Sequence, residues 1–183
     1  MRNDLQQSLS RSYIDPSTLS IFQRILLTTD GTVTDMLEAY LFEQIRLVKL
    51  SEELVTTTDD IDPMQLNKGS SVLDRKILLQ GKISRKNYIY AESIIVIDRL
   101  DDYFQKDLLK TKTPIGKIWR EQRFETFKEI VDTGKKPANE LADYFEIEPE
   151  ANLLFRTYCV FSNRQSVMMI SEYFPESYFL NRL

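Results

Sequence analysis

Two pairs of apolar segments with a two-residue alternation constrain the fold of this chain more than any other feature. The first pair is VLDRKILLQ, residues 72–80, with YIYAESIIVI, residues 88–97; the second is LLFRTYCVF, residues 153–161, with VMMISEYF, residues 167–174. All four segments are enriched in β-branched and aromatic residues, and a polar turn separates the members of each pair. This pattern is typical of β-hairpins in which one face of each strand looks into a core.

Two helices are predicted before the first hairpin. Residues 15–26 begin with Asp-Pro-Ser, a typical helix start, and continue with a mainly apolar stripe that ends before a turn at residues 28–31. Thr32 is the expected cap of a second helix over residues 33–41, because apolar side chains recur there at helical spacing. The two segments together predict a helical hairpin.

The remaining segments are less regular. We expect a strand at residues 45–50 and, after it, a long polar connection at residues 51–71, which is a candidate cover for a site. Short helices are predicted at residues 98–109 and at residues 139–145. Residues 124–132 fit the periods of a helix and of a strand equally poorly, and we favour a strand there. The sum is an α+β fold with an antiparallel sheet.

Length and composition predict one soluble domain over residues 1–183, with residues 1–15 as a loosely ordered N-terminal segment. The chain has 183 residues, of which 42% are hydrophobic and 28% charged, which suits a globular domain with a real core. No apolar run is long enough to span a membrane, and the first residues lack the apolar centre of a secretory signal. We therefore expect a cytoplasmic protein.

The chain contains no histidine and a single cysteine, Cys159, which narrows the chemistry. Triads that depend on histidine, metal sites built on histidine or cysteine clusters, and an internal disulfide are all excluded. A glycine-rich phosphate loop is absent, which argues against nucleotide-dependent chemistry. A net charge of −4 without a dense basic block speaks against nucleic acid as a partner.

Three charged residues fall on strand faces that are otherwise apolar. Arg75 alternates with Leu73, Ile77 and Leu79, and Glu172 alternates with Met168, Ile170 and Phe174. Glu92 shares its face with two tyrosines and two aliphatic residues. A charge on such a face costs several kcal/mol in order of magnitude unless a partner meets it.

Two interpretations account for these charges. One is a buried ion pair of Arg75 with Glu172 or Glu92 that holds the two hairpins together. The other is a closed pocket in which Arg75 clamps a carboxylate at one end of a ring and Glu172 exchanges a proton at the other. In that pocket, burial would raise the pKa of the Glu172 carboxyl and fit it for acid work. Gly116 and the turn at residues 30–31 offer backbone NH groups that can hold an anion.

An ordered set of motifs resembles the chorismate pyruvate-lyase family, in the branch formerly catalogued as a domain of unknown function. The motifs are RILLTTDGTVTDMLEAY, DRKILLQG, YAESIIVIDRL, TPIGKIW, LLFRTYCVF and MMISEYFPES, and they cover the chain from about residue 21 to residue 178. The resemblance implies a chorismate lyase-like α+β fold with a six-stranded antiparallel sheet, helices on one side and a buried ligand pocket. It implies the removal of pyruvate from chorismate to give 4-hydroxybenzoate, without metal or organic cofactor, for quinone or other aromatic biosynthesis.

The resemblance also implies roles for individual residues. By position, Arg75 looks like the ligand of the product carboxylate, and Glu172 looks like the glutamate at the hydroxyl end. Val33 and Ile115 look like main-chain contacts, and the neighbouring Thr32 and Gly116, together with Glu92, are candidates for further pocket residues. As a mechanism we expect Glu172 to act at the ether oxygen of chorismate.

Two other functions stay open at this point. The same fold serves as a non-catalytic sensor domain that binds an aromatic or sugar acid, although no helix-turn-helix precedes the domain here. A structural protein whose buried charges only form an ion pair is the third alternative. The chain is expected to act as a monomer or a homodimer.

Overall fold

The computed structural model describes residues 14–100 and 126–180. Its helical part begins with η1 (Pro16–Thr18), a 3-10 turn, followed by α2 (Ile21–Thr28) and α3 (Val33–Leu41). A break at Leu19 and Ser20 divides the predicted first helix, because Ser20 starts a new helix as its cap. The Ser20 hydroxyl accepts from the Gln23 amide and the Gln23 side chain accepts from the Ser20 amide, which makes a capping box.

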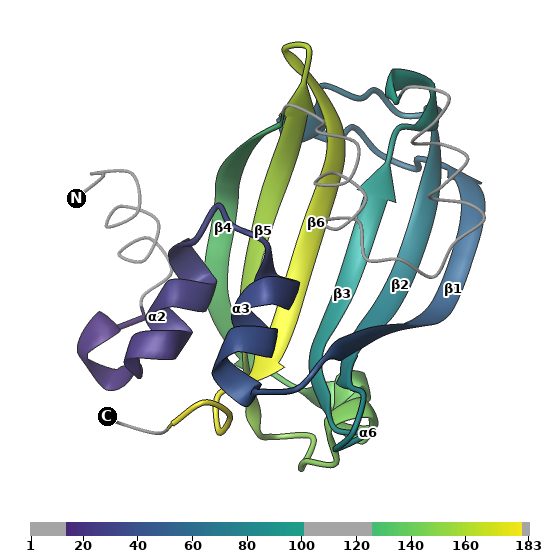
Figure 1. The fold of residues 1–183 in the computed structure, drawn as a ribbon. Helices are drawn as coiled ribbons and strands as arrows, with labels where there is room; N and C mark the ends of the chain where they lie inside the picture. The colour runs from purple at the N-terminus through teal and green to yellow at the C-terminus, as the bar shows by residue number, and fades with distance from the viewer. Residues whose placement is uncertain (1–13, 101–125, 181–183) are drawn as a thin grey trace.

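Six antiparallel strands form one sheet in the order β1-β2-β3-β6-β5-β4. The strands are β1 (Ile45–Thr56), β2 (Ser71–Gly81), β3 (Asn87–Ile95), β4 (Phe127–Pro137), β5 (Asn152–Ser162) and β6 (Gln165–Pro175). The chain thus builds two three-stranded meanders, and these meet where β3 pairs with β6 in the middle of the sheet (Figure 1). Both predicted hairpins and the α+β class with its six-stranded antiparallel sheet are confirmed.

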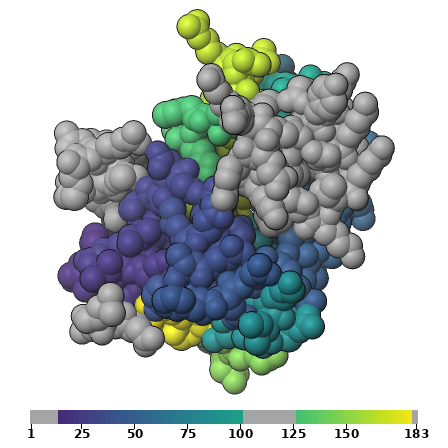
Figure 2. Space-filling view, in the orientation of Figure 1, coloured from purple at the N-terminus to yellow at the C-terminus, as the bar shows by residue number. Residues whose placement is uncertain are grey.

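One face of the sheet carries α2 and α3, which lie over the lower part of the meander β4-β5-β6 in Figure 1 and form the purple and blue surface there in Figure 2. Two apolar clusters lie on this face, which we call the site face. The cluster below includes Leu37, Ile89, Leu154 and Phe174 and packs against the two helices. The cluster above includes Leu73, Ile95, Val160 and Met168. A row of polar side chains separates the two clusters.

The opposite face is covered by other segments. Met64 and Leu66 pack there against Val72 and Cys159, close to the short turn η2 (Asp62–Met64). At the lower end, η4 (Asn139–Leu141) and α6 (Ala142–Phe145) pack against this same face. The helices therefore do not all lie on one side of the sheet. Of the connection predicted at residues 51–71, the first six residues belong to β1, and Met64 and Leu66 pack on the face away from Arg75.

The predicted strand at residues 45–50 is too short. β1 continues to Thr56, through a register shift between Lys49 and Ser51. The bulge breaks the alternation, and the exposed residues after it give no apolar pattern, so the sequence resembles a loop. The predicted helix at residues 98–109 lies mostly outside the described residues; within them only η3 (Ile97–Arg99) is present. In the described ranges, no helix has the length and apolar character to cross a bilayer.

Candidate active site

Arg75 and Glu172 lie on the same face of the sheet, on strands from different meanders. Arg75 of β2 pairs with Ser93 of β3, and Ser93 pairs with Ile170, two residues before Glu172 on β6. Neighbouring strands lie about 4.8 Å apart and each residue advances about 3.3 Å, so the two Cα atoms are roughly 12 Å apart. The β3 residues between them, Ala91 and Ser93, are small and buried. Two buried charges therefore stand at either end of a floor of small side chains.

Arg75 is buried to 1% exposure, yet it has few partners. Its Nε lies 3.3 Å from Oε2 of Glu52 on β1, an ion pair without hydrogen-bond geometry. Within the described part of the chain, none of its three side-chain nitrogens has a hydrogen-bond partner. Burial lowers the pKa of Arg75, and the Glu52 carboxylate offsets part of that effect. A buried guanidinium with its terminal nitrogens unused is suited to grip a ligand carboxylate with two parallel hydrogen bonds.

Glu172 is also buried, but both of its oxygens have partners. Oε2 accepts from Nε of Arg156 at 2.7 Å, and Oε1 accepts from the Tyr158 hydroxyl at 3.0 Å. Arg156 and Tyr158 lie two residues apart on β5, where alternation brings both side chains to the site face. The ion pair that the sequence suggested for Arg75 with Glu172 is therefore absent, because each charge has a different partner: Glu52 for Arg75 and Arg156 for Glu172.

The electrostatics of this cluster keep Arg156 charged and Tyr158 neutral. Burial by itself would lower the pKa of Arg156, but the Glu172 carboxylate and Tyr158 together outweigh it and hold that pKa above the ordinary value. Burial and the Glu172 charge together raise the pKa of Tyr158 well above its usual range. Because Arg156 and Tyr158 both donate, Glu172 is arranged as an acceptor. This arrangement favours a role different from the acid role expected from the sequence.

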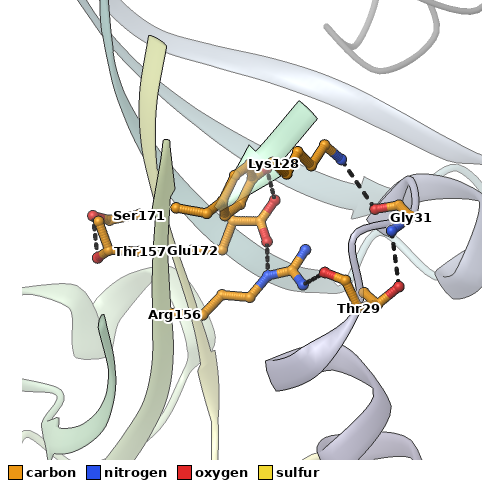
Figure 3. A network of polar contacts seen from close by, with 8 residues as sticks. Thr29, Gly31, Lys128, Arg156, Thr157, Ser171 and Glu172 are labelled. Atoms are coloured by element: carbon orange, nitrogen blue, oxygen red, sulfur yellow. Dashed lines mark hydrogen bonds and ion pairs between the residues drawn. The ribbon is translucent and has the colours of Figure 1, made fainter. Parts of the chain in front are cut away.

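The loop between α2 and α3 closes one side of the cluster. The Thr29 carbonyl accepts from Nη1 of Arg156 at 2.6 Å, and the Gly31 carbonyl accepts from Nζ of Lys128 on β4 at 3.2 Å (Figure 3). Thr32 occupies the cap position of α3, as predicted, although its side chain makes no cap hydrogen bond. Val33 is buried in the first turn, where backbone amides have no partner within the helix.

The other predicted site residues do not join this group. Glu92 pairs in register with Lys76 and Ser171 and accepts from the Tyr90 hydroxyl at 2.9 Å. Because these residues alternate with Arg75 and Glu172, Glu92 lies on the opposite face of the sheet. Ile115 and Gly116 lie outside the described residues.

Sequence reasoning missed three charged residues of the candidate site: Arg156 and Lys128 near Glu172, and Glu52 beside Arg75. Arg156 carries the same signal as Arg75, since it alternates with Leu154, Tyr158 and Val160 on an apolar face. Lys128 lies in a segment whose periodicity fits helix and strand equally poorly. Glu52 follows the bulge of β1, in a stretch that resembles a loop.

The described residues also line a cavity, which lies away from the cluster around Glu172. It has a volume of 520 Å³ and lies at the far end of β4 and β5, where it is lined by Thr126, Phe127, Phe161, Ser162, Asn163 and Arg164. None of these residues belongs to the cluster around Glu172. The ligand pocket expected from the resemblance therefore stays a prediction. Among the described residues, no three Asp, Glu or Cys side chains come close enough to hold a metal ion.

The sheet order and the helical layer define an α+β domain of the chorismate lyase-like fold. Solved structures with a similar fold include PhnF from Mycobacterium smegmatis, with a TM-score of 0.61 and 13% identity over 80% of this chain and 64% of PhnF. The effector domain of the same protein gives a TM-score of 0.60, covering 79% of this chain and 88% of that domain. A GntR-family transcriptional regulator from Enterococcus faecalis gives 0.56 at 13% identity, covering 75% of this chain and 98% of the regulator. At these identities the likeness concerns the fold alone.

Sequence comparison gives the family. The protein-family model described as "Chorismate pyruvate-lyase Rv2949c-like" matches residues 27–181 of this chain. The chorismate pyruvate-lyase of Mycobacterium leprae is 35% identical over 158 residues, which are 85% of this chain and 75% of the relative. That of Mycobacterium tuberculosis H37Rv is 29% identical over 168 residues, covering 85% of this chain and 80% of the relative. The chain belongs to the Rv2949c-like chorismate pyruvate-lyase family.

Proposed function

We propose that this protein binds chorismate and eliminates pyruvate from it to give 4-hydroxybenzoate, without a metal or organic cofactor. Membership of the family supports the lyase class. The observation that carries the proposal is the buried guanidinium of Arg75, which has no hydrogen-bond partner among the described residues and shares a sheet face with Glu172. A native structure keeps such a group only for a reason, and a ligand carboxylate supplies one.

The two charges fit the two ends of the substrate ring. Chorismate carries a ring carboxylate opposite a carbon that bears a hydroxyl group. In our proposal the terminal nitrogens of Arg75 take the ring carboxylate and Glu172 accepts from the hydroxyl. The ring then lies over Ala91 and Ser93, whose small side chains leave room for it. We assign the backbone amides of the first turn of α3, beginning at Val33, to the Glu172 end, because the loop before this helix contacts Arg156.

The reaction needs little chemical apparatus. The bond between the ring and the ether oxygen breaks, the hydroxyl-bearing carbon loses its hydrogen, and the departing enolpyruvate takes up one proton to become pyruvate. Aromatisation of the ring drives the step, so the protein contributes positioning and charge stabilisation. Because Arg156 and Tyr158 both donate to Glu172, we assign Glu172 to orienting the hydroxyl. This replaces the proton delivery to the ether oxygen that the sequence suggested.

Incubation with chorismate tests the proposal. Purified protein in the presence of a metal chelator is expected to release equal amounts of 4-hydroxybenzoate and pyruvate, measured by chromatography and by a coupled pyruvate assay. Glu172→Gln is expected to slow turnover at least about tenfold, equivalent to roughly 1.4 kcal/mol of lost transition-state stabilisation. No product above the spontaneous background would contradict the proposal. A sensor would instead bind chorismate and leave it intact, and a structural protein would bind neither compound.

A further inference from the structure

Chorismate carries a second carboxylate that Arg75 cannot hold. It belongs to the enolpyruvyl group, which is attached to the ring carbon next to the one that bears the hydroxyl. If Arg75 takes the ring carboxylate and Glu172 accepts from the hydroxyl, the second carboxylate must lie near the Glu172 end. A desolvated carboxylate requires a cation or several hydrogen-bond donors there.

Lys128 is a cation at that end. It lies on β4 and reaches across the site face, where its Nζ lies 5.4 Å from the centre of the Tyr158 ring and donates to the Gly31 carbonyl at 3.2 Å. The same ring has the guanidinium of Arg156 5.0 Å from its centre. Burial lowers the pKa of Lys128, with the charge of Glu172 acting in the opposite direction. The ammonium is thus partly desolvated and close to the carboxylate that we assign to the substrate hydroxyl.

Arg156 adds a donor. Its Nε binds Glu172 and its Nη1 binds the Thr29 carbonyl, whereas its Nη2 is buried without a hydrogen-bond partner among the described residues. In Figure 3 this remaining nitrogen of Arg156 points away from the Thr29 contact, on the side where Lys128 reaches over. Arg156 is 1% exposed, so an unused donor there is costly unless a ligand meets it.

We propose that Lys128 and the Nη2 group of Arg156 form a subsite for the enolpyruvyl carboxylate of the substrate. This inference rests on the proposed function, because it takes the position of the ring from Arg75 and Glu172. The subsite distinguishes substrate from product: chorismate has the second carboxylate, and 4-hydroxybenzoate lacks it. Once the ether bond breaks, the aromatic product keeps only its contacts at Arg75 and Glu172, while pyruvate leaves from the Lys128 end.

The test compares two ligands that differ in one ring substituent, a carboxyethoxy group that carries the second carboxylate. One is 4-hydroxybenzoate; the other is 3-(1-carboxyethoxy)-4-hydroxybenzoate, which has both carboxylates and cannot react. Calorimetric titration of Lys128→Met is expected to show at least about tenfold weaker binding of the dicarboxylate and a change within about twofold for 4-hydroxybenzoate. Lys128→Arg is expected to recover part of the loss. The kcat/KM of Lys128→Met for chorismate, relative to that of the wild type, is expected to fall in parallel with its affinity for the dicarboxylate.

Lys136→Met is the matched control. Lys136 lies on the same strand, and its Nζ is 4.1 Å from the centre of another tyrosine ring, Tyr173, on the opposite face. The Lys136→Met variant should bind both ligands as the wild type does. Equal losses for the two ligands in Lys128→Met, or no loss for either, would overturn the subsite; Lys128→Gln gives the same reading if the methionine variant folds poorly. Wild type that discriminates the ligands but leaves chorismate intact would count against the proposed function and not against the subsite.

Discussion

At the scale of single residues, Arg75 and Arg156 are both buried but differ in how the protein satisfies them. Arg156 has a carboxylate and a backbone carbonyl as partners. Among the described residues, Arg75 has only a loose ion pair with Glu52, whose other oxygen accepts from Lys49 at 2.6 Å. A buried donor without a partner costs about 1–3 kcal/mol, and more when it is charged. Arg75 therefore lowers stability in the free protein and gains its partners when a ligand carboxylate binds.

This difference predicts opposite outcomes for two matched substitutions. Arg75→Met should leave the free energy of unfolding unchanged or raise it, because Glu52 keeps Lys49 as a partner. Arg156→Met should lower it by about 3–5 kcal/mol, because Glu172 stays buried without its cation. Urea unfolding measures the free energy of unfolding of both variants.

Binding of 4-hydroxybenzoate should follow a different order. Binding should be lost in Arg75→Met. In Arg156→Met binding should only weaken, because Glu172 loses the partner that orients it. Similar losses of stability and of affinity in the two variants would contradict this account of the two arginines.

The sequence reveals such residues when they alternate with apolar neighbours. Arg75 and Glu172 stand out for this reason, and Arg156 carries the same signal. The partners of these residues cannot be recognised from alternation. Glu52 and Lys128 reach the cluster from strands whose own pattern is weak, and which carboxylate faces which arginine depends on the register between strands far apart in sequence.

At the scale of elements, the turn between β2 and β3 is tied to the end of α3 by Glu43. Oε2 of Glu43 accepts from the amides of Ile83 and Ser84, both at 3.0 Å, and Oε1 accepts from the Tyr88 hydroxyl at 3.2 Å. Hydrogen bonds from Ser84 lower the pKa of Glu43 below its ordinary value of 4.5. The contact links the helical layer to the hairpin that carries Arg75.

The lowered pKa gives this contact a defined pH dependence. Its contribution to stability is fully present above the ordinary pKa of 4.5 and is lost as the pH falls through the lower folded value. Glu43→Gln should therefore melt at a lower temperature than wild type near neutral pH, and the two melting curves should converge in acid.

Glu53→Gln, a change at an exposed glutamate of β1, serves as the control and should leave the melting temperature unchanged at every pH. A difference between wild type and Glu43→Gln that persists well below pH 4.5 would show that the glutamine acts through something other than the charge.

Element prediction succeeded where one face is mainly apolar along the strand. β2, β3, β5 and β6 have such faces and were found from alternation. The second half of β1 was not, because a bulge interrupts its alternation and its later residues are solvent-exposed at a sheet edge. An edge strand with polar side chains on both faces has the composition of a loop, so only the partner strand reveals it.

At the scale of the whole molecule, the candidate site joins the two halves of the sheet. Arg75 and Glu52 come from the meander β1-β2-β3, and Glu172, Arg156, Tyr158 and Lys128 come from the meander β4-β5-β6. The pairing of β3 with β6 fixes the offset between the two groups. Each hairpin is visible in the sequence, but this long-range pairing is not, and neither is the placement of α2 and α3 over the same face.

The central claim is that one aromatic acid lies between the two halves, with its carboxylate at Arg75 and its hydroxyl at Glu172. A crystal structure with bound 4-hydroxybenzoate tests it most directly. The account predicts both carboxylate oxygens within hydrogen-bond distance of the terminal nitrogens of Arg75, the hydroxyl at Glu172, and the ring over Ala91 and Ser93. An acid bound in the reversed orientation, or in the cavity beside Phe127 and Phe161 with Arg75 still paired only to Glu52, would contradict it.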